Sequence, residues 1–459
     1  FSETVGSIAG AGNLTLGSTG TTTFTSGGND QSTTFSGVIS GGTANAFTKT
    51  GSGDLLLTGA NTMSGNVTVA NGGLALNAAS GALGSASNIT INAGGTLALG
   101  ASNQINDNAN LILSGGTFSS GGFSETMRQL SQTTASTIDY LNDGGVLRFN
   151  GVNGSIAGLG TVTGTLSITN WAGSISGGGT EQLVVYSPSG APSVANITFV
   201  DWGGASVIDR SGILGAGFYE IVPTATGVNW NVDSATTQNW AVNGNWSPNS
   251  AFPNASDAIA ILGNTIGSPP LDNNITISMQ TTSRTVGKLI FENSANRNYT
   301  VGNGTSGRLD FNVSSGSAQI IVNDDGAHTI AASSRINDPL VITNNSGNAG
   351  NGLTLSGQLD MRSINQTFTV NGSGNTLISG ALTQNGVTGS LLKTGSGKLI
   401  LSNAGNSYTG TTTVRNGTLE VGADSQSGGN GALGNASSAI VVNDASTTPT
   451  MNTALVIGA

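Results

Sequence analysis

Residues 47–76 have the sequence FTKTGSGDLLLTGANTMSGNVTVANGGLAL, and residues 391–421 repeat its pattern as LLKTGSGKLILSNAGNSYTGTTTVRNGTLEV. The shared Lys-Thr-Gly-Ser-Gly string starts at Lys49 and again at Lys393, 344 residues later. A match this long and in one order indicates an internal duplication. We expect a structural role in this repeat cassette for Gly51, Gly53, Asn61, Gly65, Asn71 and Gly72, and for their counterparts Gly395, Gly397, Asn406, Gly410, Asn416 and Gly417.

A shorter period runs through and beyond the first cassette. Three alternating apolar pairs follow one another at intervals of 22 residues: Val67 and Val69, Ile89 and Ile91, Leu111 and Leu113. A turn rich in Asn and Gly follows each pair, as in Asn71-Gly72-Gly73. Alternation over four or five residues is the period of a half-buried strand, and Asn-Gly or Gly-Gly between two such runs marks a tight turn. The pattern therefore predicts short strands and excludes long helices.

Strands and turns at a fixed interval predict the coils of a β-solenoid. In such a fold each coil lies on the previous one, and one side-chain face of every strand points into a continuous core. A series of hairpins in a sandwich or propeller is the alternative. The solenoid is favoured because the constant spacing lets Val67, Ile89 and Leu111 stack directly.

The cassette, together with the preceding segment TTFSGVISG at residues 33–41, resembles the autotransporter-associated β-strand repeat of secreted bacterial proteins. The resemblance covers roughly residues 1–120 and 280–459 and is specific for the family rather than for one activity. It implies a right-handed parallel β-helix at the cell surface or in the extracellular matrix, which acts as a stalk, an adhesin or a scaffold.

Composition supports a repetitive β protein. The chain has 459 residues, 72 of them Gly; 8% are charged, and there is no Cys. Disordered chains usually carry high net charge and lack strand periodicity, so disorder is disfavoured. Without Cys, stability must come from strand stacking instead of disulfides, which fits a bacterial surface protein.

The charge balance bears on partners. The net charge is −10, and the 13 Lys and Arg are scattered along the sequence, so we expect no nucleic-acid partner. No run of 18 apolar residues and no signal peptide is present. Both ends of the sequence fall inside repeat-like or strand-like stretches, and we expect the chain to be a piece of a longer precursor.

We predict an all-β protein with two β-solenoid segments and an intervening β cap or sandwich-like domain. The expected division has four parts: a solenoid segment at 1–122 with the first cassette, a β-rich cap or intermediate domain at 123–225, a Trp-rich start of the second unit at 226–280, and a second solenoid segment at 281–459. The middle part is set apart by longer strands with bulkier residues, which could cover the exposed strand edges of an open solenoid end.

Trp230, Trp240 and Trp246 lie within seventeen residues of one another. Aromatic rings this close could form a platform on which a sugar ring stacks. The other interpretation, which is the more common use of a Trp cluster at the start of a coil stack, is the apolar core of a cap. We retain the three residues as candidate glycan contacts.

The sequence contains few residues of the types that catalyse reactions or bind metal ions. Nucleophilic catalysis with a His base needs a His near a Ser or Cys, and the chain has one His and no Cys. We expect His328, at a turn into a strand, to be exposed. The turn Asn323-Asp324-Asp325-Gly326 is rich in oxygen ligands but does not match an EF-hand. We therefore predict no catalytic, cofactor-binding or metal-binding residues.

The enzyme alternative is a β-helix that acts on polysaccharide, which needs carboxyl groups held on one face. At a coil period near 22, the best pair is Asp338 with Asp360, with Arg335 and Arg362 nearby. The two arginines lie at different offsets from their acids, so they would not stack in register with the pair. Chance spacing explains the pair adequately, and we predict no enzymatic activity.

The sequence thus predicts an extracellular or cell-surface structural protein that serves as a stalk, scaffold or filament-forming unit. Its expected partners are further copies of itself, joined head to tail or as a tandem array, because open strand ends do not close on themselves. The alternative is an adhesin that binds host or matrix glycan through turns and the Trp-rich middle region. A polysaccharide-active enzyme is the less favoured third possibility.

Overall fold

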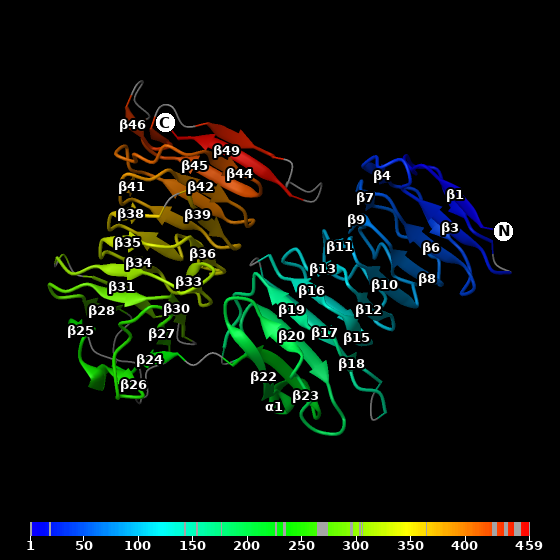
Figure 1. Ribbon diagram of the computed structural model, residues 1–459, viewed down its shortest axis with the longest axis horizontal. Coiled ribbons are helices and arrows are strands. Elements are labelled where there is room, and N and C mark those ends of the chain that lie inside the picture. The colour runs from blue at the N-terminus through cyan, green and yellow to red at the C-terminus, as the bar shows by residue number, and fades with distance from the viewer. Residues whose placement is uncertain are drawn as a thin grey trace. The chain divides into compact units, whose positions relative to one another are not determined.

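The computed structural model divides into two compact units, Phe1–Ala225 (unit 1) and Thr226–Ala459 (unit 2) (Figure 1). Within them the structure describes residues 2–17, 20–141, 144–152, 155–175, 177–224, 227–232, 236–263, 274–293, 297–302, 304, 306–363, 365–424, 429–435, 439–444 and 451–458. Strands dominate both units. The described helices are α1 (Ser211–Leu214) and a single 3-10 turn at Asn243–Asn245. In the described part of the chain, no helix is long and apolar enough to cross a membrane.

Unit 1 is built from two large sheets. The eight-stranded sheet contains, in spatial order, β1 (Glu3–Val5), β3 (Thr23–Ser26), β6 (Ala46–Lys49), β8 (Asn66–Val69), β10 (Asn88–Asn92), β12 (Asn110–Ser114), β15 (Gln129–Thr134) and β18 (Leu159–Val162). The 13-stranded sheet contains β14 (Glu125–Met127), β17 (Gly145–Phe149), β20 (Glu181–Tyr186), β23 (Phe218–Pro223), β22 (Gly203–Asp209), β21 (Ile197–Phe199), β19 (Leu166–Thr169), β16 (Ser136–Asp139), β13 (Thr117–Ser119), β11 (Gly95–Leu99), β9 (Gly72–Leu76), β7 (Leu55–Leu57) and β4 (Thr33–Phe35). A smaller pair joins β2 (Leu14–Thr15) to β5 (Ile39–Ser40).

The strands of unit 1 stack as the sequence period predicts. Ile89 in β10 pairs in parallel with Val67 in β8 on one side and with Leu111 in β12 on the other. All three side chains are fully buried, whereas the alternating Thr68 and Thr90 are half-buried on the outward face. The predicted β-solenoid class is therefore confirmed. Its apolar columns form because an in-register parallel pair places equivalent side chains one above the other.

Unit 1 ends in an antiparallel hairpin. The parallel pairing runs on past residue 122 as far as β21 and β20. There β22 pairs antiparallel with β21 and with β23, and β23 pairs antiparallel with β20. The hairpin thus covers the last strand edges of two parallel stacks, which would otherwise present free N–H and C=O groups. The four-part division of the chain stays a prediction.

Unit 2 has three larger sheets. The ten-stranded sheet contains β26 (Trp246–Ser247), β24 (Val228–Trp230), β27 (Ile259–Gly263), β30 (Lys288–Glu292), β33 (Ala318–Val322), β36 (Leu340–Asn344), β39 (Gln366–Asn371), β42 (Gly389–Lys393), β44 (Thr412–Val414) and β48 (Ile440–Val442). The nine-stranded sheet contains β25 (Gln238–Asn239), β28 (Asn274–Ser278), β31 (Asn298–Val301), β34 (His328–Ile330), β37 (Leu353–Leu355), β40 (Thr376–Ile378), β43 (Lys398–Leu401), β45 (Gly417–Val421) and β49 (Thr453–Ile457). The five-stranded sheet contains β29 (Arg284–Val286), β32 (Leu309–Phe311), β35 (Ser334–Ile336), β38 (Leu359–Met361) and β41 (Leu382–Gln384), and a hairpin joins β46 (Asn430–Gly431) to β47 (Gly434–Asn435).

Coil length varies more in unit 2 than in unit 1. In the five-stranded sheet Asp310 pairs with Arg335 and Arg335 with Asp360, so these coils are longer than those that stack Val67 on Ile89. In the ten-stranded sheet the step from Lys288 to Gln319 is longer again. Figure 1 shows β35, β38 and β41 stacked one above another along one side of this unit. These pairs of strands are still parallel, because the extra residues lie in the turns.

Candidate functional site

The cassette turns leave no room for side chains. A Cβ atom on Gly51 would lie 1.8 Å from the Gly27 carbonyl oxygen, and one on Gly65 would lie 1.5 Å from the Asn45 carbonyl oxygen. Added Cβ atoms on the other cassette glycines would also meet backbone or side-chain atoms at less than 3.0 Å: Gly53, Gly72, Gly395, Gly397, Gly410 and Gly417. Successive turns therefore stack backbone against backbone, which is the close approach that glycine permits.

Asn61 and Asn406 join neighbouring coils in the same way. The Asn61 side chain accepts a 2.7 Å hydrogen bond from the Ile39 N–H and donates a 2.8 Å bond to the Ala82 carbonyl. Asn406 accepts from the Leu382 N–H at 2.8 Å and donates to the Ala432 carbonyl at 2.7 Å. Both side chains are buried, so each amide satisfies a backbone donor in one coil and a backbone acceptor in another.

A buried lysine ammonium is the feature of the cassette that the sequence prediction missed. Lys49 Nζ donates to the carbonyls of Thr50 at 2.6 Å, Gly51 at 3.0 Å and Asn71 at 3.3 Å. Burial lowers the pKa of Lys49, although the carboxylates of Asp54 and Asp30 act in the opposite direction. The signal available in the sequence was the recurrence of a Lys at the same cassette position.

Lys393 repeats the arrangement in the second cassette. Its Nζ donates to the carbonyls of Thr394 at 3.3 Å and Asn416 at 3.2 Å, and to that of Gly395. Because Asn71 and Asn416 belong to the next coil, each ammonium ties two turns together. The adjacent Gly72 and Gly417 have φ values of 65° and 73°, in the left-handed region that glycine accepts. In both turns the Asn side-chain oxygen accepts the glycine N–H.

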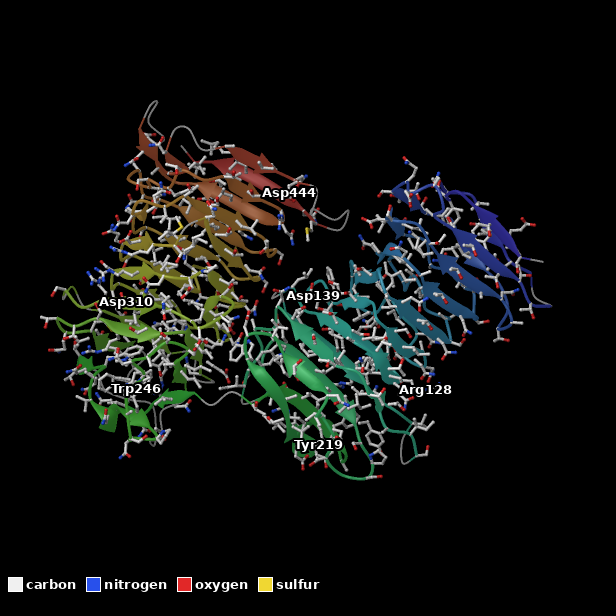
Figure 2. The ribbon with its side chains drawn as sticks, viewed as in Figure 1. Arg128, Asp139, Tyr219, Trp246, Asp310 and Asp444 are labelled. Atoms are coloured by element: carbon white, nitrogen blue, oxygen red, sulfur yellow. The ribbon has the colours of Figure 1, made fainter. Side chains whose placement is uncertain are left out.

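The three clustered tryptophans are interior residues at the start of unit 2. Figure 2 labels one of them, Trp246. Trp230, Trp240 and Trp246 are each 0% exposed. The Trp246 ring meets the rings of Trp230 and Trp240 edge to face at 5.0 and 4.7 Å. Their indole N–H groups donate 2.8 Å hydrogen bonds to the carbonyls of Val232, Pro253 and Trp240. A sugar ring therefore finds no exposed indole face here, and a glycan-contact role for these residues stays a proposal.

His328 was expected to be exposed, and that expectation is wrong. The side chain is 1% exposed and stacks on the Phe291 ring at 4.3 Å. Its Nδ1 accepts the Tyr299 N–H at 3.2 Å, and its Nε2 lies 2.7 Å from Asp324 Oδ1. The local turn gives no sign of this burial, because the covering ring comes from another coil.

The sequence spacing of Asp338 and Asp360, which was attributed to chance, does not make them register partners. Asp360 lies opposite Arg335, because the local coil is longer than the period on which the pairing was based. Asp338 instead accepts the Val313 N–H at 2.9 Å. Asp360 forms an ion pair with Arg362, whose Nε lies 2.8 Å from Asp360 Oδ2.

The basic residues are scattered along the sequence, but several of them lie on or beside one sheet in the structure. Of the nine arginines in the sequence, four lie on or beside the five-stranded sheet: Arg284, Arg308, Arg335 and Arg362. The sequence hides this grouping because each of the four belongs to a different coil. Among the residues that the structure describes, no group of three or more His, Cys, Asp or Glu is placed to hold a metal ion.

Two buried carboxyl groups of unit 1, those of Glu125 and Glu220, were not predicted. Burial raises the pKa of Glu125 to about 7, opposed by hydrogen bonds from the N–H groups of Gln104 and Ile105. Burial also raises the pKa of Glu220 to about 7, opposed by the Gly178 N–H and by Arg210. Both carboxyl groups accept backbone N–H bonds and so hold turns in place. Their sequence spacing carries no motif.

Comparisons with known proteins agree with the fold. Residues 47–76 and 391–421 match the passenger-associated-transport-repeat. A stretch of 84 residues is 48% identical to a protein named adhesin BmaC autotransporter from Brucella suis biovar 1 (strain 1330), and it covers 18% of this chain and 2% of that protein. No solved structure matches the chain significantly. The predicted resemblance to autotransporter-associated repeat proteins is confirmed, and with it a location outside the cell or at the bacterial surface.

Proposed function

We propose that this surface passenger segment is a non-enzymatic stalk or scaffold. The observation that carries the proposal is the continuous parallel stacking within each unit, in which inward residues such as Val67, Ile89 and Leu111 form fully buried columns. Backbone hydrogen bonds in such a stack run along the solenoid axis, so extension is resisted by many bonds that must break together. The chemistry-bearing groups also support a structural role, because His328, Asp324 and Glu125 are engaged within the fold.

Force spectroscopy on the full chain tests the stalk role. Pulling from the two termini should give force peaks at which whole groups of coils unfold together. A Lys49→Met variant, which keeps the length of the side chain but loses its three carbonyl contacts, should lower the force at which unit 1 opens. Thr68→Val on the outward face is the matched control and should leave that force unchanged. Gradual extension without force peaks would contradict a mechanical role.

Filament formation is a second form of the structural role, and a separate observation supports it. β48 and β49 are the last strands of the ten-stranded and nine-stranded sheets. They expose apolar side chains to an unusual extent, with Val442 42% and Ile457 68% accessible. An exposed apolar edge strand invites a further strand, whichever chain supplies it. Negative-stain electron microscopy over a concentration series should then show end-to-end fibres.

A charge introduced into the edge strand β49 tests filament formation, and the same substitution in α1 is the control. Ile457→Lys should abolish the fibres, whereas Ile213→Lys, at a 73% exposed position in α1 of unit 1, should not. Short particles at every concentration would rule out self-assembly of this segment and leave the stalk role alone.

The alternative function is adhesion to glycan, which is supported by the name of the Brucella relative. If the glycan contacts Trp230, Trp240 or Trp246, binding must open the cap that buries them. Acrylamide quenching of tryptophan fluorescence should then rise when a binding glycan from a screen is added. Binding without any change in quenching would place the glycan site elsewhere on the molecule.

A further inference from the structure

The five-stranded sheet of unit 2 carries a line of arginines on its outward face. Leu309 and Phe311 are fully buried, so the alternating Asp310 and its in-register partner Arg335 face away from the core. Arg308 lies two residues before Asp310, and Arg362 lies two residues after Asp360, the next in-register partner of Arg335. All of these charged residues are half-buried on one face. Arg308, Arg335 and Arg362 therefore form a diagonal across three adjacent strands.

The diagonal fixes a regular separation between the guanidinium groups. Each step rises by one strand and advances by two residues along it, which places successive Cα atoms about 8 Å apart. Asp310 and Asp360 lie on either side of Arg335 in the same column. The face therefore alternates hydrogen-bond donors with acceptors at a constant spacing.

Two of the three arginines have an Nε atom that no hydrogen bond from the described residues engages. In the described part of the chain, Arg308 Nε, Arg335 Nε and Asp310 Oδ1 are buried atoms without a hydrogen-bond partner. Arg362 differs, because it pairs with Asp360. A buried Nε without a hydrogen-bond partner in the described residues also occurs at Arg148 and Arg284, so the regular spacing of the diagonal is what distinguishes this face. A guanidinium group is a planar fork that suits the two oxygens of a carboxylate.

We propose that this face binds an extended polysaccharide that carries carboxylates at intervals along an otherwise neutral, hydroxyl-rich chain. Arg308 and Arg335 would take successive carboxylates, while Asp310 and Asp360, on either side of Arg335, would accept hydroxyl hydrogens. A densely charged polyanion such as nucleic acid fits poorly, because those two aspartates and the net charge of −10 repel it. A neutral glycan would leave the guanidinium charges unmatched. The proposal goes beyond the stalk role and does not depend on it.

Binding of a hyaluronan decasaccharide, in which uronic acid alternates with a neutral amino sugar, tests the proposal. Affinity is measured by surface-immobilised binding of the full chain at low and physiological salt, with dextran and heparin as neutral and densely charged comparisons. The wild type should bind hyaluronan more tightly than either comparison, and salt should weaken the binding. Arg308→Gln with Arg335→Gln should weaken it by a factor on the order of ten or more.

A matched double variant separates local recognition from net charge. Arg128→Gln with Arg415→Gln removes the same charge at positions outside the five-stranded sheet and should leave hyaluronan affinity unchanged. Asp310→Asn with Asp360→Asn should raise the affinity for heparin relative to hyaluronan. Circular dichroism checks that each variant is folded. Equal losses in the two arginine variants, absence of hyaluronan binding at low salt, or a preference of the wild type for heparin would each overturn the proposal.

Discussion

The outward faces of the two units carry different kinds of side chain at stacked, in-register positions. In unit 1, the eight-stranded sheet carries one column of five threonines in register: Thr4, Thr25, Thr48, Thr68 and Thr90. In unit 2, the five-stranded sheet carries the column Asp310, Arg335 and Asp360. Parallel in-register stacking places equivalent side chains one strand spacing apart, about 4.8 Å. Neutral side chains can repeat at that distance, whereas charged ones must alternate in sign.

The two units also differ in where their ionisable groups lie. Unit 1 presents a largely neutral sheet and keeps Glu125 and Glu220 buried. Unit 2 places a group of its charges on one outward face, where the carboxylates alternate with arginine. The two units should therefore respond to pH, to charge reversal and to loss of hydroxyl groups in different ways.

The largest expected effect is that of pH on unit 1. The folded-state pKa values of Glu125 and Glu220, about 7, lie above the ordinary value of 4.5. The folded state therefore holds protons that the unfolded state has lost, so the stability that these two groups contribute is greatest below pH 4.5 and is lost as pH rises to about 7. The loss should be about 3 kcal/mol per group. Hydrogen exchange in β14 and β23, corrected for intrinsic rates, should be faster at about pH 7.5 than at about pH 5.

Glu125→Gln sharpens that prediction. The amide keeps the size of the side chain but cannot ionise, so exchange in β14 should lose most of its pH dependence while β23 retains its own. Exchange that slows with rising pH in the wild type would contradict the raised pKa values.

The second-largest effect on stability is expected from charge reversal in the column of Asp310, Arg335 and Asp360 in unit 2. Arg335→Asp places three aspartates in consecutive register positions and should reduce the free energy of unfolding of unit 2 by about 2 kcal/mol. Added salt should recover part of the loss, because charges that are only half-buried are still partly screened. Urea unfolding at low and high salt measures both effects. Thr48→Asp, a single charge in the neutral column, is the control and should cost less.

Breaking the amide ladder of unit 1 should have a smaller effect. Asn88 donates to Asn66 at 2.9 Å and accepts from Asn110 at 2.8 Å, beside the threonine column. Asn88→Ala should cost about 1 kcal/mol, because its two partners turn to water. Urea unfolding measures the loss, which should not depend on salt. A loss as large as that of Arg335→Asp would remove the distinction between the two faces.

The smallest effect is expected for the threonine column itself. The Thr68 side chain is half-buried and has no hydrogen-bond partner in the described residues. Thr68→Val keeps the shape and the strand preference of the residue, so the free energy of unfolding should change by less than about 0.5 kcal/mol in either direction. A larger loss in urea unfolding would mean that the hydroxyl groups stabilise the stack.

The sequence predicts the fold where coil length is constant. Val67, Ile89 and Leu111 stack as expected because the turns between them have equal lengths. It fails in the five-stranded sheet, where the coils are longer, so a search at the period of unit 1 pairs Asp338 with Asp360 and misses the Arg335 column. Side-chain register depends on every turn, and a single sequence does not reveal which residues a longer turn absorbs.

Burial of polar groups was harder still to predict. His328 is covered by Phe291 from a neighbouring coil, and Lys49 is satisfied partly by the Asn71 carbonyl of the next turn. Both partners are distant in the sequence, so no local pattern points to them. Only their recurrence could reveal them, and Lys49 alone has a counterpart in the second cassette. The resemblance to a repeat family thus predicted the architecture but not the contacts that hold each turn.

Disulfide trapping tests the in-register stacking most directly, since the chain has no native Cys. Cysteines at Thr68 and Thr90, or at Arg335 and Asp360, replace directly opposed residues on adjacent strands and should cross-link readily under mild oxidation. Cysteines at Asp338 and Asp360 keep the sequence spacing of Thr68 and Thr90 but are not register partners, and they should stay reduced. Efficient cross-linking of the cysteines at positions 338 and 360, together with no cross-linking at 335 and 360, would contradict the in-register stacking. The stalk role, filament formation through the edge strands and the arginine diagonal all depend on that stacking.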